Sequence, residues 1–287
     1  MMSVSLAWGS SYLLMKIGLD SISPFNLIAL RFGIAFICMV LIFLPRFRVL
    51  SVSTLAKGTL MGILLFLLFS GLVYGVNHTT ASTAGFLAST TVIIVPIIES
   101  ILKRRLPNRS IMLCILLVVI GLYLLTVKEP FTLDRGSLYC LLAALFYAIY
   151  IVVSDRIAKN EDTLLISIIQ LGVTALLGAL SMICVETPSL PETPIQWSAI
   201  IGLGLICSAY GFVVQPMVQR YMSPEKIGLI FSLEPVFSAI LSYIFLHEIL
   251  TGKGYLGAIL IFSGIVLSKI TIPGAISHVY RAIQSQR

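Results

Sequence analysis

The sequence predicts an all-α membrane protein with ten transmembrane helices, built as two five-helix repeats of inverted topology. Hydrophobic residues make up 58% of the 287 positions, charged residues make up 11%, and the mean hydropathy is +1.04. A soluble domain has about 45–50% apolar and ~25% charged residues. The apolar residues also fall into ten long runs, and the two halves of the chain share a pattern of residues and breaks.

The ten apolar runs are each close to the ~20 residues that a helix needs to cross ~30 Å of hydrocarbon. They are continuous and rich in Leu, Ile and Val rather than alternating, which indicates helices and not the strands of a barrel. We expect the spans at residues 2–20, 25–44, 58–77, 80–102, 110–127, 136–154, 163–185, 196–218, 224–246 and 254–270. These runs leave no extramembrane domain that could hold a soluble active site.

The repeat is seen in Gly85-x-x-x-Ser89, which recurs as Gly228-x-x-x-Ser232 at an offset of 143 residues. Because each half has an odd number of spans, the second half is inverted across the membrane. Inverted repeats are typical of secondary transporters, whose substrate site lies near the midplane where the repeats meet. The expected units are residues 1–130, residues 131–270 and a cytoplasmic tail at 271–287.

The basic residues predict the orientation of the chain. With the N-terminus inside, fourteen Lys and Arg fall in inner loops and the tail and three in outer loops. This excess places both termini in the cytoplasm of a multi-pass protein of the cytoplasmic (inner) membrane. The net charge of +7 is therefore a topology signal and not a nucleic-acid footprint. The inner loop after the fourth span reads KRRLPNR, and its counterpart after the ninth span, on the outer side, reads HEILTGK. An inverted repeat predicts this loss of the positive cluster from the outer copy.

Two segments resemble the EamA-type permeases of the drug/metabolite transporter superfamily. The first runs from Leu6 to Phe32 and the second, LEPVFSAILSYIFLHEIL, from Leu233 to Leu250. The matching residues are Trp8, Gly9, Ser10, Lys16, Pro24, Arg31, Glu234, Pro235 and Glu248. The resemblance implies gradient-driven transport of small metabolites, amino acids among them, with no enzymatic activity and no cofactor. This chain departs from the family pattern at Thr91-Val92, which stands opposite Glu234-Pro235, and at Arg105, where many members carry Glu.

Glu234 is the ionisable residue that the sequence places deepest in the membrane. It lies ten residues into the ninth span, ~15 Å at ~1.5 Å per residue, and Pro235 predicts a kink beside it. A charged side chain at this depth raises the free energy of membrane insertion by about 2.5–3.5 kcal/mol, so its presence indicates a functional or structural role. Glu234 either couples proton movement to transport or is a structural residue bonded to a neighbouring helix.

Lys16 and Arg31 lie at similar depths, ~6–9 Å below the outer surface, on adjacent helices. They either receive a carboxylate or phosphate of the substrate or have structural roles. The structural alternatives are snorkelling to the interface and pairing with Glu234 or a backbone carbonyl. Under an offset of 139 residues, Lys16 falls on Asp155 and Arg31 on Gln170, so the two halves differ in charge here.

Aromatic and amide residues form a third candidate set, in which each member either lines a central cavity or is packed or lipid-facing. Trp8 and Tyr147 are equivalent at the 139-residue offset, so one aromatic from each half is expected to face the other. The set comprises Trp8, Tyr12, Tyr74, Asn77, Tyr147, Tyr150, Tyr210 and Gln215.

Small residues four positions apart predict close helix packing, within the bundle or in a homodimer. The pairs are Gly58/Gly62, Gly71/Gly75, Ala84/Ala88 and Gly254/Ala258. The five cysteines lack metal-ligand spacing, no nucleotide-binding G-x-x-x-x-G-K-[ST] motif occurs, and His247-Glu248 lacks a second His. We therefore expect no metal site and no ATPase.

Together these features predict a secondary transporter that moves small metabolites such as amino acids outward by alternating access. Its expected partners are a small-molecule substrate, the lipid bilayer and, as the coupling ion, protons; exchange of substrates is the other driving force considered. One alternative is a carrier of phosphorylated or nucleotide-linked sugars from the same superfamily. Another, from a different class, is an intramembrane enzyme or a lipid-handling subunit, which would need paired catalytic groups at the midplane.

Overall fold

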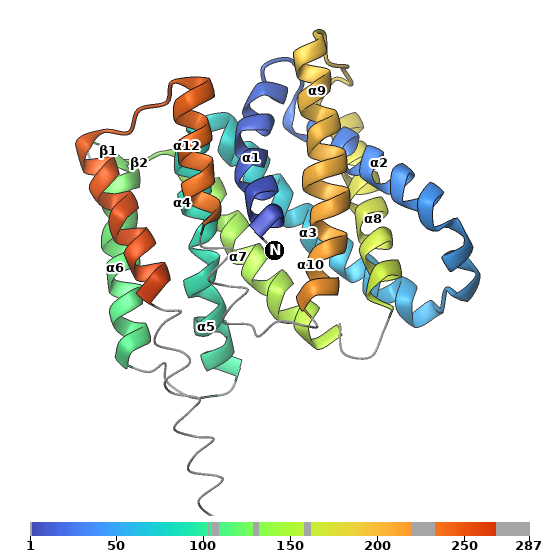
Figure 1. The fold of residues 1–287 in the computed structure, drawn as a ribbon, viewed down its shortest axis with the longest axis horizontal. Coiled ribbons are helices and arrows are strands. Elements are labelled where there is room, and N and C mark those ends of the chain that lie inside the picture. The colour runs from blue at the N-terminus through green and yellow to red at the C-terminus, as the bar shows by residue number, and fades with distance from the viewer. Residues whose placement is uncertain are drawn as a thin grey trace, which may run out of the picture.

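In the computed structural model of the chain, the described residues are 2–102, 104, 109–128, 132–157, 162–219 and 233–267. These residues form helices joined by loops, together with a pair of two-residue strands (Figure 1). The first half contains α1 (Met2–Gly18), α2 (Pro24–Phe43), η1 (Leu44–Val49), α3 (Val52–His78), α4 (Ala81–Ser89), α5 (Thr91–Leu102) and α6 (Arg109–Thr126). The second contains α7 (Arg135–Ile157), α8 (Thr163–Val185), α9 (Pro194–Gly202), η2 (Leu203–Tyr210), α10 (Gly211–Gln219), α12 (Glu234–Leu246) and a last helix at Gly252–Leu267. Strands β1 (Val127–Lys128) and β2 (Thr132–Leu133) pair antiparallel between the halves.

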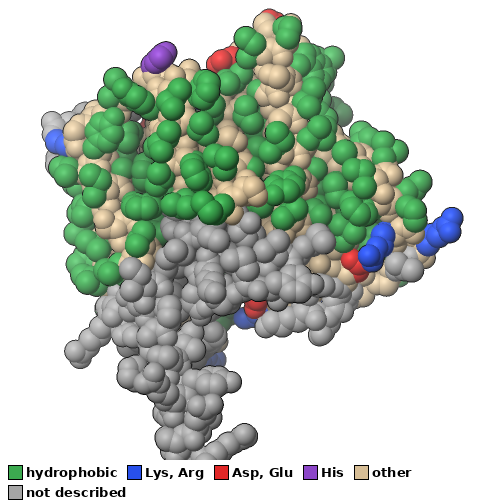
Figure 2. Space-filling model, viewed as in Figure 1, with side chains coloured by type: hydrophobic (Ala, Val, Ile, Leu, Met, Phe, Trp, Pro, Cys, Tyr) green, Lys and Arg blue, Asp and Glu red, His purple; other side chains and the backbone are tan. Residues whose placement is uncertain are grey.

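Within the described residues, helical segments overlie all ten expected spans, so the all-helical prediction is confirmed. Six helices are long and apolar enough to cross a membrane, and three shorter apolar helices accompany them. In the described part of the visible face, hydrophobic side chains predominate and charged ones are few (Figure 2). Large apolar side chains such as Leu41 and Val185 are about 70% exposed. A surface this apolar fits a protein that lies in lipid.

Local signals set the beginnings of several helices. Pro24 stands in the first turn of α2, where its missing N–H leaves no intrahelical bond unmade. The side chain of Ser51 accepts from Thr54 N at the start of α3, and Thr193 forms a capping box with Gln196 at the start of α9. Helix α3 therefore starts at Val52, six residues before the apolar run that predicted it.

Two predicted spans are not regular helices. The fourth is divided between α4 and α5, where Ser89, Thr90 and Thr91 each donate a side-chain hydroxyl to the carbonyl three residues earlier. Such bonds compete with the backbone ladder and bend helices. The eighth span contains the π-helical stretch η2 between α9 and α10. Wider turns of this kind frequently mark functional sites.

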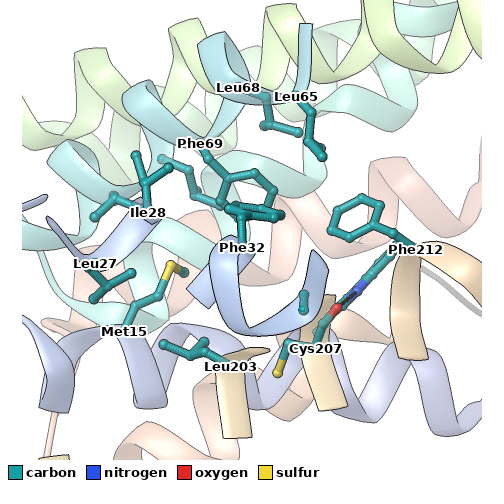
Figure 3. Close-up of a cluster of buried hydrophobic side chains, with 14 of the residues drawn as sticks. Met15, Leu27, Ile28, Phe32, Leu65, Leu68, Phe69, Leu203, Cys207 and Phe212 are labelled. Atoms are coloured by element: carbon teal, nitrogen blue, oxygen red, sulfur yellow. Dashed lines mark hydrogen bonds between the residues drawn. The ribbon is translucent and has the colours of Figure 1, made fainter. Parts of the chain in front are cut away.

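The core lies where helices from the two halves meet. Helix α3 packs on α7 and α8, α2 packs on α8 and η2, and α1 packs on α12 and α9. Figure 3 shows the centre of this core, where Phe32 of α2 and Phe69 of α3 lie together and Phe212 of α10 is close by. The aromatic centroids of Phe32 and Phe69 are 4.8 Å apart.

Glycines bring the backbones close in this bundle. A Cβ on Gly9 of α1 would lie 2.6 Å from Phe237 Cβ, and one on Gly85 would lie 2.7 Å from Ser238 Oγ. Both neighbours belong to α12, which therefore sits tightly between α1 and α4. The predicted small-residue pairs are used in the same way, since Gly58 and Gly62 face α8, and Gly71 and Gly75 face α7. These two pairs thus serve packing inside the bundle.

Some predicted features lie outside the described residues. These are the second copy of the repeat motif at Gly228 to Ser232, Arg105, the start of the ninth span at 224–232, the end of the tenth at 268–270, and the tail at 271–287.

Candidate functional site

A small cavity lies at the centre of the bundle, between helices of both halves. Its walls come from α1, α2, α3, α4, α7, α10 and the start of α12. The lining residues are Trp8, Ser11, Tyr12, Arg31, Leu68, Phe69, Leu72, Ala88, Ala144, Tyr147, Phe212 and Glu234. The cavity is narrow, with room for a few water molecules, so a metabolite can bind only if the helices move apart.

Trp8 is fixed in the cavity wall by the irregular stretch η2. Its indole Nε1 donates a 3.0 Å hydrogen bond to the carbonyl of Cys207. The ring also lies over Gly211, where a side chain would leave it no room. Its centroid is 5.3 Å from that of Phe212 and 6.4 Å from that of Tyr147. The structure therefore brings the two predicted facing aromatics, Trp8 and Tyr147, into edge contact at the cavity.

Arg31 is buried on α2, with 1% of its surface exposed, and lines the same cavity. Its Nε donates a 3.0 Å hydrogen bond to Ser208 Oγ, and Ser208 is again a residue of η2. The guanidinium carbon lies 4.5 Å from the ring centroid of Phe69 and 5.0 Å from that of Phe32. Cation–π attraction offsets part of the cost of removing this charge from water.

Glu234 begins α12, and Pro235 stands buried in the first turn of that helix. The Glu234 carboxylate lines the cavity, where its Oε1 accepts a 2.9 Å hydrogen bond from the hydroxyl of Tyr12. Tyr12 belongs to α1, so this bond links the first half of the chain to the second. A half-buried carboxylate with one hydrogen bond from the described residues is a group that can exchange a proton or bind a cation.

Other sequence candidates, among them Lys16, Tyr74 and Asn77, lie outside the cavity lining. Lys16 Nζ donates 3.0 Å hydrogen bonds to the carbonyls of Val76 and Thr79, at the C-terminal end of α3. Tyr74 donates its hydroxyl to Glu186, and Asn77 is exposed. Lys16 thus takes the backbone-carbonyl arrangement, which was one of its alternatives, while Arg31 faces the cavity.

Tyr150 does not line the cavity but contacts residues that do. Its hydroxyl donates to Gln170 Oε1 over 2.9 Å, and its ring centroid is 6.2 Å from that of Tyr147. Tyr150 is buried, and its ring lies beside those of Tyr147 and Phe212, which both line the cavity.

Sequence reasoning missed the residues that hold the candidates in place. Ser208, Phe32, Phe69 and Phe212 carried no motif, because a serine or phenylalanine in an apolar run looks like any other core residue. The one local signal is the glycine-rich composition around η2, where Gly202, Gly204 and Gly211 are spaced through ten residues. That signal indicates irregular backbone but does not say which side chains it serves.

Two carboxylates join the halves at the end of the bundle that the charge distribution places outside. Glu186 follows α8 and accepts hydrogen bonds from the backbone N–H of Phe25 and Asn26, at the start of α2. Glu248 follows α12 and accepts from the backbone N–H groups of Ala81 and Ser82, at the start of α4. Each carboxylate satisfies free N–H groups at a helix N-terminus, where the helix dipole also favours negative charge.

Comparison with known proteins gives a consistent picture. The chain matches the EamA-like transporter family twice, over residues 1–127 and 134–270. It is 30% identical over 272 residues to an "Uncharacterized transporter" of Archaeoglobus fulgidus, covering 94% of this chain and 84% of that protein. It is 28% identical to the "Uncharacterized transporter YoaV" of Bacillus subtilis, covering 94% of this chain and 95% of the relative.

A solved crystal structure resembles the chain along almost its whole length. It superposes with a TM-score of 0.68, covers 93% of this chain and 95% of its own, and is 22% identical in sequence. At this identity the likeness shows a shared fold.

Proposed function

Because this chain belongs to the EamA-like transporter family, we propose that it is a secondary transporter that exports small metabolites such as amino acids across the cytoplasmic membrane. Family membership and the apolar helices make it an integral membrane transporter, with a small-molecule substrate and the bilayer as partners. We further propose that the two halves of the chain are inverted relative to each other in the membrane and that both termini lie in the cytoplasm.

The packing of the helices supports two inverted halves that work by alternating access. In the first half, α3 packs on α7 and α8; correspondingly, the segment α9–η2–α10 of the second half packs on α1 and α2. Likewise, α1 packs on α12 while α7 packs on α4 and α5. Each of these contacts therefore has a counterpart in which the helices of the two halves are exchanged, as a two-fold axis between the halves requires. With an odd number of spans in each half, such an axis lies in the membrane plane. The two separate family matches, over residues 1–127 and 134–270, divide the chain between α6 and α7, where the two halves meet.

The observation that carries the substrate class is the pair of opposite charges in one aromatic cavity. Arg31 and Glu234 both line it, and neither is ion-paired with the other in the described structure. An amino acid carries a carboxylate and an ammonium group, and the rings of Trp8, Tyr147 and Phe212 suit an apolar side chain. A phosphorylated sugar fits less well, because a phosphate dianion would meet the Glu234 carboxylate.

The enzyme alternative receives no support from the described residues. Glu234 is the single carboxylate among the residues that line the cavity, and no group of three or more His, Cys, Asp or Glu side chains in the described structure could hold a metal ion. A hydrolytic site in the membrane would need a second catalytic group beside Glu234.

The test is transport by the purified protein in proteoliposomes, across a panel of amino acids and other metabolites, with an imposed pH gradient. We expect gradient-dependent flux of at least one amino acid, and flux of no compound would refute the proposal. Proton coupling through Glu234 predicts that Glu234→Gln loses the response to the pH gradient. The control is Glu192→Gln, which changes an exposed glutamate in the loop before α9. If Glu234→Gln keeps the full pH response, Glu234 is not the coupling group.

A further inference from the structure

The guanidinium of Arg31 is only partly satisfied by the protein around it. Its Nε is bonded to Ser208, and the rings of Phe69 and Phe32, whose centroids are 4.8 Å apart, lie close together beside it. Its Nη1 is buried and has no hydrogen-bond acceptor among the described residues. Buried arginines are normally paired, because an unpaired buried donor keeps the whole cost of leaving water.

The carboxylate that shares the cavity does not fill this role. Glu234 accepts its hydrogen bond from Tyr12, and the described residues contain no ion pair that involves Arg31. The other intramembrane cation that the sequence singled out, Lys16, is bonded to the end of α3. Arg31 is therefore a cation that lines the cavity and has a buried donor, Nη1, with no acceptor among the described residues.

We propose that Arg31 is the specificity-determining residue of the cavity and that its Nη1 binds a carboxylate group of the transported metabolite. This inference rests on the proposed transport function and assigns one end of the substrate to one side chain. The cation–π contacts with Phe69 and Phe32 do not satisfy the N–H donors in the guanidinium plane, and Nη1 is left without an acceptor among the described residues. A planar carboxylate can lie in that plane and accept from Nη1, and the charged hydrogen bond strengthens in a site that excludes water.

Ser208 is a positioning residue in this arrangement. Its bond to Nε holds the guanidinium in one rotation and so fixes the direction of Nη1. Because Ser208 lies in η2, the irregular turn of the eighth span serves the site twice: Cys207 holds Trp8 and Ser208 holds Arg31. Removing the Ser208 hydroxyl should weaken carboxylate binding while leaving the charge of Arg31 in place.

A binding assay can test this without measuring transport. The chain has two tryptophans, Trp8 in the cavity wall and Trp197 on α9. In the full-length Trp197→Phe protein, reconstituted in lipid vesicles, the tryptophan fluorescence that remains comes from Trp8. The probes are benzoate and benzamide, which have nearly the same size and shape and differ in charge. Inorganic phosphate and phenylphosphonate serve as probes for a general anion site.

We expect benzoate to change Trp8 fluorescence saturably and benzamide to require at least a tenfold higher concentration. Arg31→Gln should weaken benzoate binding at least tenfold and remove the preference over benzamide. Arg31→Lys should restore part of it, and Ser208→Ala should weaken it severalfold. If Arg31→Gln does not fold, the probe comparison in the Trp197→Phe protein and the Ser208→Ala variant decide.

Three results would overturn the proposal. The first is equal binding of benzoate and benzamide, or no saturable response to benzoate. The second is benzoate binding that is unchanged in a folded Arg31→Gln protein. The third is phosphonate or phosphate binding as tight as that of benzoate, which would show a general anion site. The two proposals can fail separately. If only the role of Arg31 is wrong, the unmodified protein still transports amino acids in proteoliposomes. If the transport proposal is wrong, the unmodified protein shows no such flux.

Discussion

Replacing Glu248 tests how the halves are held together at the predicted outer face. His247 ends α12 in a left-handed conformation with φ of 53°, and this reversal turns Glu248 toward the start of α4. There the carboxylate accepts from Ala81 N at 3.0 Å, from Ser82 N at 3.1 Å and from Ser82 Oγ at 3.1 Å. Glu248→Ala removes all three bonds and leaves two N–H groups of α4 without this acceptor.

The magnitude follows from these three contacts. Hydrogen bonds to charged groups contribute about 1.5–3 kcal/mol each when buried, and losing a helix N-cap costs about 0.5–2 kcal/mol. Glu248 is only half-buried, so water can replace part of what the carboxylate supplies. We therefore expect Glu248→Ala to lower the free energy of unfolding by about 2 kcal/mol, a factor of about 30 in the folded-to-unfolded ratio. Glu248→Gln, which keeps one acceptor oxygen, should lose about half as much.

The assay is reversible unfolding of the full chain in mixed micelles, with Glu192→Ala as the control for loss of an exposed glutamate. Hydrogen exchange gives a local readout, because protection of the amides of Ala81 and Ser82 should fall more than that of amides elsewhere in α4. If Glu248→Ala is as stable as Glu192→Ala and those two amides keep their protection, the carboxylate does not hold α4 and the reasoning fails.

Further variants test packing and the place of Lys16. A Cβ on Gly257 would lie 2.6 Å from the carbonyl oxygen of Gly121, so Gly257→Ala should destabilise the protein by about 1–2 kcal/mol. Gly33→Ala is the matched control, because a Cβ on Gly33 would meet nothing within 4 Å, and we expect this variant to be more stable by up to ~1 kcal/mol. The free energy of unfolding is measured for both variants, and equal effects would refute the packing argument. Lys16→Met should lower stability by about 1–2 kcal/mol by freeing two carbonyls of α3, with Lys16→Arg retaining more. Lys16→Met should leave benzoate binding to the Trp197→Phe protein unchanged, and loss of that binding would place Lys16 in the site.

The helices could be predicted from the sequence because each apolar run has to cross the same thickness of lipid. The seventh predicted span, 163–185, coincides with α8, and the second differs from α2 by one residue at each end. The division between α4 and α5 and the π-helical stretch η2 could not be predicted. Both depend on which carbonyls are taken by side chains, at Ser89 to Thr91 within the helix and at Cys207 from Trp8.

The sequence predicted residue types that line the cavity, but it could not predict the direction in which each side chain points. Trp8, Arg31, Tyr147 and Glu234 meet in one cavity, whereas Lys16 and Tyr74 are bonded elsewhere. Hydropathy gives the depth of a residue in the membrane, but its rotation about the helix axis depends on what the neighbouring helices offer. Lys16 and Arg31 have similar predicted depths, yet one faces the end of α3 and the other faces Ser208 and Phe69.

The sequence by itself determined that the chain lies in lipid, how many times it forms a helix, and which few ionisable groups are costly enough to need a purpose. These follow from composition and length, since the hydrocarbon core penalises every charge and every unpaired backbone group. Only the tertiary structure decided which of those groups share a cavity. Partners more than 170 residues apart, such as Arg31 with Ser208 and Tyr12 with Glu234, are joined by helix packing that no local pattern encodes.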